Sequence, residues 1–352
     1  MKTLAIIGCG GIGKYHLDHF LLIAEVIEMV GFCDLIPERA QNFQEIAGCG
    51  KAYTDYKIML EETTPDMVFI CIPPYCHGEI EFELIARNIP FFVEKPLTLD
   101  LDLARRIRDA VEEKGLITAC GFQSRYSDLV DLNRDFVDKN QIIYVATTRI
   151  GGIPTAEWFR QKDKSGGQIV EQTIHQFDIM RYMLGEPEEV FTYATSGYIT
   201  QEEMPGYQTD DLSTTVIRFQ NGLLGTVATG LVSKSGNCHE NKIIFSARDK
   251  RAELKILNWL KIYGDQSDET AEKVGGFVVQ GDGAVAEGGD CVLYHQVEDA
   301  GMACDYTFIE AVITGDGSKI RSPYADAFKS LSFTLACNES IATGKPVKVV
   351  LE

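Results

Sequence analysis

The stretch Ile6-Ile7-Gly8-Cys9-Gly10-Gly11-Ile12-Gly13 lies between an apolar segment, residues 3–7, that is expected to form a β-strand and an amphipathic segment that is expected to form a helix. A G-x-G-x-x-G pattern in this strand–turn–helix context predicts a dinucleotide-binding site. In such a loop Gly8 permits the tight turn and Gly10 lets the backbone approach a pyrophosphate. Gly13 lets the helix pack closely on the strand. The alternative is a glycine turn without a ligand.

The start of the predicted helix and the end of the next strand indicate which dinucleotide would bind. The first-turn amides, those of Gly11 and Ile12 among them, are expected to face the phosphates. A second apolar run, residues 27–33, ends at Asp34, whose carboxylate can accept hydrogen bonds from the adenosine ribose. That carboxylate would repel the 2′-phosphate of NADP, and the first basic residue after it is Arg39, a helical turn away. The pattern therefore favours NAD.

The bulk properties indicate a water-soluble protein of two domains. The chain has 352 residues, more than a single hydrophobic core usually supports. Its net charge of -19 argues against nucleic acid or an anionic membrane as a partner. No segment reaches the roughly 20 apolar residues of a membrane span, and the N-terminus lacks a secretion signal, so we expect a cytoplasmic location. The 10 cysteines include no C-x-x-C pair, and we expect buried reduced thiols and no metal site.

Two patterns of predicted elements divide the chain near residue 121. Residues 1–121 alternate strands and helices, which predicts a parallel Rossmann-type sheet with helices on both faces. In residues 122–352, successive strands without helices between them predict a large, mostly antiparallel open sheet with flanking helices. The fold class is thus α/β followed by α+β. The strands are expected at 141–149, 190–198, 212–219, 223–232, 242–247 and 252–262, the helices at 168–184, 302–314 and 324–343, and a loop with at most a short strand at 265–290.

Two segments carry candidate catalytic residues. Glu94-Lys95-Pro96 follows a predicted parallel strand, and ligands of such sheets bind outside the carboxyl ends of the strands. Lys95 is therefore expected to reach the cofactor; the alternative is a lysine that merely ends a strand. In the expected helix 168–184, Glu171 and His175 are four residues apart and would share one face. Ionisable groups on a buried apolar helix lower stability unless they are paired or used, and a structural histidine is the alternative for His175.

In these motifs the chain resembles the glucose–fructose oxidoreductase / inositol dehydrogenase (Gfo/Idh/MocA) family over essentially its full length. The resemblance implies NAD(P)-dependent hydride transfer between nicotinamide and a secondary alcohol of a sugar, sugar derivative or cyclitol. It also implies a homodimer or homotetramer that uses an open face of the second sheet. The matching features are Gly8-x-Gly10-x-x-Gly13, Pro73-Pro74 with His77, Glu94-Lys95-Pro96, Gly166-Gly167 before Glu171 and His175, and the segments 308–315 and 340–347.

The resemblance assigns roles to individual residues. His175 would be the general base, since the pKa of a histidine lies near working pH. Lys95 would hydrogen-bond the reacting oxygen and stabilise its developing negative charge. Glu171, which many relatives replace by Asp, would accept a substrate hydroxyl. The further cofactor contacts implied are Pro73, His77, Glu94 and Gln123, and the further substrate contacts are Arg125, Tyr126, Trp158 and Arg160.

Several alternatives stay open. Trp158 can equally be a packing residue, Arg160 a surface salt bridge, and Asp178 a residue that only fixes the helix. His16 is expected to be a packing or solvent-facing residue. For the whole chain, the alternatives are an NAD-dependent glycosidase that acts through transient oxidation and a non-catalytic sugar sensor. The presence of both Lys95 and His175 argues against the sensor.

Overall fold

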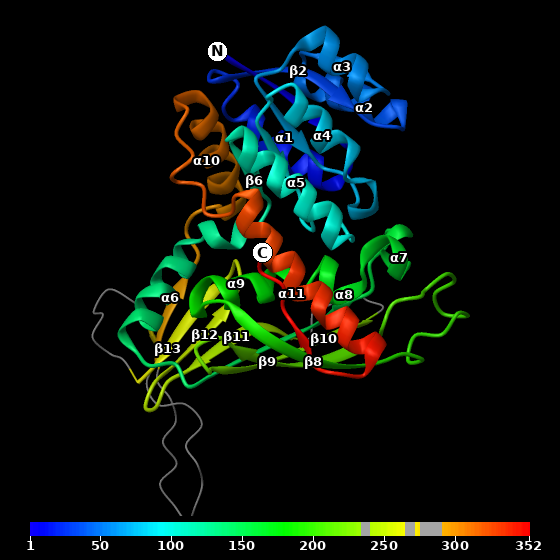
Figure 1. The fold of residues 1–352 in the computed structure, drawn as a ribbon. Helices are drawn as coiled ribbons and strands as arrows, with labels where there is room; N and C mark the ends of the chain where they lie inside the picture. Colours follow the sequence, from blue (N-terminus) through cyan, green and yellow to red (C-terminus); the bar gives the residue numbers. More distant parts are fainter. Residues whose placement is uncertain (234–239, 265–271, 275–290) are drawn as a thin grey trace, which may run out of the picture. The chain divides into compact units, whose positions relative to one another are not determined.

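The computed structural model describes residues 1–233, 240–264, 272–274 and 291–352, and the chain forms two compact units (Figure 1). The first unit contains Met1–Gln123, Gly301–Ser332 and Leu351–Glu352, and the second contains Ser124–Ala300 and Phe333–Val350. The expected division gave every residue after 121 to the second domain, whereas residues 301–332 belong to the first unit.

The first unit is built on a six-stranded parallel sheet of order β3-β2-β1-β4-β5-β6. This is the strand order of dinucleotide-binding folds, and ligands of such sheets bind where the order reverses, between β1 and β4. β4 is buried along its whole length, as a strand covered on both faces should be. The strands are β1 (Lys2–Ile7), β2 (Ile27–Cys33), β3 (Lys51–Tyr53), β4 (Met67–Ile70), β5 (Phe91–Val93) and β6 (Thr118–Cys120).

The helices of the first unit begin and end at residues that the sequence marks. The carboxylate of Asp100 accepts hydrogen bonds from the first backbone amides of α5, and Gly115 ends that helix with φ 60°. Pro37 opens α2, and Gly48 ends it with φ 65°. The elements are α1 (Gly11–Leu21), α2 (Pro37–Ala47), α3 (Tyr56–Thr63), η1 (Pro74–Cys76), α4 (Glu79–Ala86), α5 (Leu101–Lys114) and η2 (Gln123–Tyr126).

The C-terminal segment 301–332 joins the first unit because it completes the core of that unit. Phe308, on α10 (Ala300–Thr314), packs edge-on against Phe69 and Phe92 with ring-centroid distances of 5.5 and 5.9 Å. The backbone oxygen of Ser322 accepts a 2.8 Å hydrogen bond from the amide of Cys120 in β6. These contacts join residues some 200 positions apart, so no local sequence pattern could reveal them.

The second unit is built on a ten-stranded sheet of order β14-β15-β13-β12-β11-β7-β10-β9-β8-β16. Among the described strand pairs, β7 and β10 run parallel and the others antiparallel, which confirms the expected mostly antiparallel sheet. The strands are β7 (Tyr144–Gly152), β8 (Pro187–Thr195), β9 (Leu212–Phe219), β10 (Leu224–Ser233), β11 (Glu240–Ser246), β12 (Arg251–Lys255), β13 (Trp259–Tyr263), β14 (Glu272–Val274), β15 (Cys291–His295) and β16 (Val347–Lys348).

The structure bears on two sequence expectations for this sheet. The single strand expected at 252–262 is wrong, because Leu257 takes φ 58° and the amide of Asn258 bonds to the oxygen of Lys255. This turn makes β12 and β13 a hairpin. Of the loop expected at 265–290, only β14 lies within the described residues, and it pairs with β15.

Helices cover one face of the second sheet (Figure 1). α6 (Asp128–Lys139), α9 (Ile174–Leu184) and the second half of α11 (Tyr324–Thr343) bury their apolar side chains against the strands. α7 (Lys162–Ser165), α8 (Gly167–Glu171) and η3 (Trp158–Arg160) precede α9 in the chain. The core formed in this way includes Leu129, Phe136, Val145, Phe177, Met180, Ile217, Phe219, Phe245, Phe333 and Cys337. Within the described part of the chain, no helix combines the length and the apolarity that crossing a membrane requires.

Candidate active site

The four glycines of the first loop fall into two kinds. A Cβ on Gly8, whose φ is +97°, would lie 2.2 Å from the backbone oxygen of Cys71, and a Cβ on Gly13 would lie 2.2 Å from that of Gly8. The protein's own packing therefore requires glycine at these two positions. Gly10 has an ordinary φ of -87°, and no described atom would lie within 4 Å of a Cβ on Gly10 or Gly11. The open space above these two residues fits the close approach of a pyrophosphate.

The start of α1 also fits an anionic ligand. Gly10 is its N-cap and provides no side-chain hydrogen bond, and the first turn, which the structure describes fully, holds no acidic residue. The first amides of a helix have no partner within the helix, and they lie at the positive end of its dipole. The residues present therefore fit the phosphates of a dinucleotide.

Asp34 holds the glycine loop against the end of β2. Its Oδ2 accepts a 2.9 Å hydrogen bond from the amide of Cys9, and its Oδ1 accepts a 2.8 Å bond from the amide of Ile36. The carboxylate is half-buried, so it can accept further bonds from solvent or a ligand. The contact of Asp34 with an adenosine ribose stays a prediction.

His77 presents one ring nitrogen for a further hydrogen bond. Its Nδ1 lies 2.5 Å from Oε1 of Glu81, whose Oε2 accepts a bond from the amide of Gly78. An ionised carboxylate can only accept, so this contact places a proton on Nδ1, and in the neutral ring Nε2 is then an acceptor. Nε2 is buried and has no hydrogen-bond partner among the described residues. This arrangement fits the predicted cofactor contact of His77, and Pro73 immediately precedes η1 in the same segment.

Lys95 lies two residues after Val93, the last residue of β5. Its backbone amide is hydrogen-bonded to the side chain of Glu94. The amide of Lys95 donates a 3.1 Å bond to Oε2 of Glu94, and the peptide bond between Lys95 and Pro96 is cis. Glu94 itself is buried, and a Cβ on Gly121 would lie 2.3 Å from its Oε1. The carboxylate of Glu94 therefore lies enclosed within the first unit, and its predicted contact with the cofactor stays a prediction.

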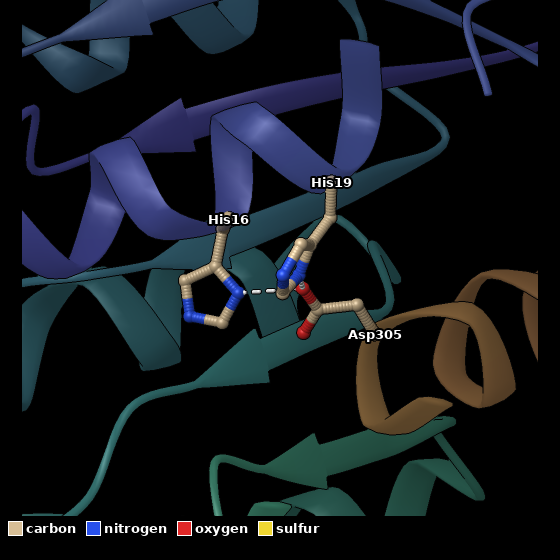
Figure 2. A group of neighbouring side chains, drawn as sticks. All are labelled: His16, His19 and Asp305. Carbon is tan, nitrogen blue, oxygen red and sulfur yellow. Dashed lines mark hydrogen bonds and ion pairs between the residues drawn. The ribbon is translucent and has the colours of Figure 1, made fainter. Parts of the chain in front are cut away.

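His16 makes contacts that the sequence did not predict. Figure 2 shows His16 and His19 projecting from α1 toward Asp305 of α10. Oδ2 of Asp305 lies 2.8 Å from Nδ1 of His16 and 2.6 Å from Nδ1 of His19, and Nε2 of His16 lies 3.1 Å from Oε1 of Glu94. Of the two expectations for His16, the packing residue is the one that the structure supports, since the side chain is 2% exposed and its ring lies against Phe69 and Phe92. Its contacts with two carboxylates were not expected.

The separations in this cluster are those of hydrogen bonds. Its three residues offer ligand atoms within 4.8 Å of one another, but tetrahedral coordination would hold ligand atoms about 3.3 Å apart. The observed N···O distances of 2.6 and 2.8 Å are shorter than that. Burial alone would lower the pKa of His16, but the charges and hydrogen bonds of Asp305 and Glu94 outweigh it and raise the pKa to about 10.

In the second unit, the helix expected at 168–184 is interrupted. α8 ends at Glu171 and α9 begins at Ile174. The amide of Thr173 reaches back five residues to the oxygen of Gln168 at 2.9 Å, and its hydroxyl lies 2.6 Å from that of Thr229 on β10. This buried hydroxyl pair fixes a wide turn of the π type. The prediction that Glu171 and His175 share the face of a single helix is therefore wrong, because they lie on opposite sides of the break.

The break leaves the two candidates in different surroundings. Glu171 is buried, whereas His175 is half-buried between the buried residues Ile174 and Gln176. An imidazole that solvent can reach is able to exchange a proton, as a general base must. Their predicted catalytic roles remain predictions.

The predicted substrate contacts of the second unit have varied surroundings. Arg125 makes a bidentate pair with Asp178, with N···O distances of 2.8 and 2.6 Å, and both side chains are 1% exposed. This placement gives Arg125 a structural role in fixing α9. Arg160 donates to the backbone oxygens of Pro154 and Thr155, so it holds its own loop instead of the surface salt bridge that was the alternative. Trp158 is half-buried beside Phe159, Tyr126 is buried, and Gln123 in the first unit accepts a 3.0 Å bond from the hydroxyl of Tyr15.

Solved structures with the same fold include dehydrogenases in complex with NADH. Levoglucosan dehydrogenase in complex with NADH has a TM-score of 0.81 at 20% identity, with 100% of both chains covered. The WlbA dehydrogenase from Bordetella pertussis, in complex with NADH and UDP-GlcNAcA, has a TM-score of 0.78 at 17% identity, with 99% of both chains covered. At these identities the likeness establishes the fold alone.

The sequence comparisons establish the family. Residues 2–122 match the model of an oxidoreductase family with an NAD-binding Rossmann fold, and residues 141–266 match the GFO/IDH/MocA C-terminal domain. The chain is 30% identical over 238 residues to scyllo-inositol 2-dehydrogenase (NAD(+)) of Bacillus subtilis, which covers 66% of this chain and 68% of that protein. It is 29% identical over 229 residues to Myo-inositol 2-dehydrogenase of Thermotoga maritima, which covers 64% of this chain and 67% of that protein. The chain belongs to the Gfo/Idh/MocA family of oxidoreductases, and the expected class of enzyme, an oxidoreductase acting on CH–OH groups, is confirmed.

Proposed function

We propose that this chain is an NAD-dependent dehydrogenase that transfers a hydride between nicotinamide and a secondary alcohol of a sugar, a sugar derivative or an inositol-like cyclitol. The observation that carries the proposal is the open space above Gly10 and Gly11. The packing of the protein does not explain this space, whereas a bound pyrophosphate would explain it. The family relatives named as inositol dehydrogenases support the class of substrate.

The proposed chemistry divides between three side chains. The cofactor supplies the hydride acceptor when it is bound. The ammonium group of Lys95 hydrogen-bonds the reacting oxygen and stabilises the negative charge that develops there. The imidazole of His175 takes the hydroxyl proton as the secondary alcohol becomes a ketone, and Glu171 accepts a hydrogen bond from a further substrate hydroxyl. In the reverse direction His175 returns the proton.

Variants of the two principal residues test the mechanism. Lys95→Ala and His175→Ala should each lower kcat about 10²–10³-fold, while the Kd for NAD changes less than about threefold. Lys114→Ala and His295→Ala remove the same chemical groups from exposed positions and serve as matched controls with unchanged kcat. Full activity in either the Lys95 or the His175 variant would remove the mechanism.

A substrate screen tests the class of reaction. NAD and NADP are each offered with inositols, aldoses, uronic acids and simple glycosides, and both reduced cofactor and released sugar are measured. Reduced cofactor that accumulates with a free sugar or cyclitol supports the proposal. Cleavage of a glycoside without net reduction would identify a glycosidase instead, and binding without turnover would identify a sensor.

The face of the second sheet that no described helix covers supports a homodimer or homotetramer. Phe191, Val216, Thr226, Ala146 and Ile244 form one row across five strands on the face opposite the helices. Val216 is 48% exposed, and the mainly apolar row fits contact with a second copy of the chain. Light scattering should give a multiple of the chain mass, and Val216→Glu should reduce it.

The free cysteines bear on the cellular location of the protein. All nine cysteines that the structure describes are free thiols, which fits a reducing compartment. We therefore propose a cytoplasmic location, and fractionation of the source cells would test it.

A further inference from the structure

We propose that His16 is a positioning residue for Lys95: a buried imidazolium that holds the carboxylate of Glu94, and through it the backbone of Lys95, while Asp305 anchors the imidazolium from the other side. The inference rests on the catalytic role proposed for Lys95. All four residues lie in the first unit.

In the proposed arrangement His16 carries a positive charge. Its two ring nitrogens face different carboxylates, Nδ1 at 2.8 Å from Asp305 and Nε2 at 3.1 Å from Glu94. An ionised carboxylate has no proton to donate, so both ring nitrogens must carry one. The resulting cation separates two buried acids that would otherwise repel each other. The raised pKa of His16, about 10, agrees with this reading.

The carboxylate of Glu94 connects this cation to the backbone of Lys95. Oε1 of Glu94 accepts from His16 and Oε2 accepts from the amide of Lys95, so each oxygen of the carboxylate has a fixed partner. Gly121 packs against the same carboxylate and has no side chain that could replace His16. Without the imidazolium, Glu94 would be a buried charge without its cation, and it would turn or take up a proton. The backbone at Lys95 would then lose its fixed hydrogen bond.

The glycine loop is held in place independently of His16. His16 lies on α1, which also begins at the glycine loop, but the loop has anchors of its own. Gly8 and Gly13 pack against backbone, and the amide of Cys9 bonds to Asp34. Loss of His16 should therefore act on the chemical step more than on the binding of NAD.

The principal test compares His16→Gln with His19→Gln. The glutamine at position 16 keeps a donor but carries no charge, and kcat should fall about 10–100-fold because the reacting group is displaced. The KM of the sugar or cyclitol found in the screen and the Kd of NAD should change less than about threefold. His19 shares the helix and the Asp305 contact, but its described hydrogen bond is not to Glu94, so His19→Gln should keep kcat within about twofold. Equal losses in the two variants would overturn the proposal.

A double-mutant cycle tests whether His16 acts through Lys95. In the Lys95→Ala background, His16→Gln should lower the residual rate less than twofold, because residues that act as a unit are not additive. If the residual rate falls by the same factor as in the wild type, His16 does not act through Lys95 and the inference fails. Full activity of Lys95→Ala would instead refute the proposed function, so the two failures are distinguishable.

A measurement without turnover tests the imidazolium directly. In protein with ¹⁵N-labelled histidine, both ring nitrogens of His16 should give protonated signals at pH 8.5, where an ordinary histidine is about 99% neutral. A titration of His16 near its ordinary pKa would overturn the proposal whatever Lys95 does. Should His16→Gln fail to fold, Asp305→Asn replaces it, and in that variant kcat should fall about 3–10-fold with the KM unchanged.

Discussion

The substitution Gly10→Ala should separate the stability of the protein from its affinity for NAD. Gly10 has a backbone conformation that alanine can adopt, and no described atom would lie within 4 Å of the new methyl group. The methyl would instead stand in the space proposed for the pyrophosphate. Gly13→Ala is the matched control, because its methyl would lie 2.2 Å from the backbone oxygen of Gly8.

The expected changes in the free energy of unfolding follow from the different surroundings of positions 10 and 13. At position 10, alanine restricts the unfolded chain, which stabilises by about 0.4–1 kcal/mol, but it is a poorer N-cap than glycine by a similar amount. The net change should lie within about 0.5 kcal/mol, or about 1–2 °C in Tm. At position 13, the clash should destabilise by about 1–3 kcal/mol or more.

Thermal unfolding without NAD and calorimetric titration with NAD measure the two effects. Gly10→Ala should weaken NAD binding at least tenfold, which is about 1.4 kcal/mol. At an NAD concentration of 100 times the wild-type Kd, the stabilisation by NAD should then drop from about 2.7 to about 1.4 kcal/mol. A Gly10→Ala protein that binds NAD as tightly as the wild type would show that the pyrophosphate does not lie over this loop.

Further predictions concern stability, pH and the choice of cofactor. Arg125→Met or Asp178→Leu alone should destabilise by about 3–5 kcal/mol in urea unfolding, whereas the double variant should lose much less, because a lone buried charge is worse than none. His16 has a folded pKa of about 10, above its unfolded value near 6.5, so its stabilisation is complete below pH 6.5 and is lost as the pH rises toward 10. Unfolding at pH 6.5, 7.5 and 8.5 should show a fall that approaches about 1.4 kcal/mol per pH unit, and a His16→Gln protein with the same slope would contradict it. The Kd for NADP should exceed the Kd for NAD at least tenfold. Asp34→Asn should lower this ratio, because the amide oxygen keeps the hydrogen bond from Cys9 while the charge that repels the 2′-phosphate is gone. Equal ratios in the two proteins would count against the role of Asp34.

Elements that depend on local signals could be predicted from the sequence. α11 runs from Tyr324 to Thr343, as expected, because Pro323 precedes it and Gly344 follows it with φ 65°. The glycine loop was also predictable, since its strand, turn and helix are contiguous. The parallel arrangement of the first sheet followed from the alternation of strands and helices, whereas its strand order is known only from the structure.

Features that depend on distant residues could not be predicted. The break between α8 and α9 lies where the hydroxyl of Thr173 bonds to that of Thr229, 56 residues away, in a segment whose apolar pattern indicates one helix. The partners of His16 lie 78 and 289 residues away, and the spacing of His16 and His19 on one helix face was the one local sign of a shared partner. A periodicity indicates that a face is buried, but it does not identify the groups that cover it.

The discontinuity of the first unit has a consequence for biosynthesis. Its first segment ends at Gln123, but Asp305 and Phe308, which complete its interior, emerge from the ribosome only after nearly the whole second unit. At about 5–20 residues per second, the N-terminal portion waits on the order of 10–40 s for them. During that interval His16 has no anchoring acid, and the rings of Phe69 and Phe92 lack the aromatic side chain that covers them. Nascent chains stalled before residue 301 should therefore be captured by chaperones, and chains released beyond residue 332 should not.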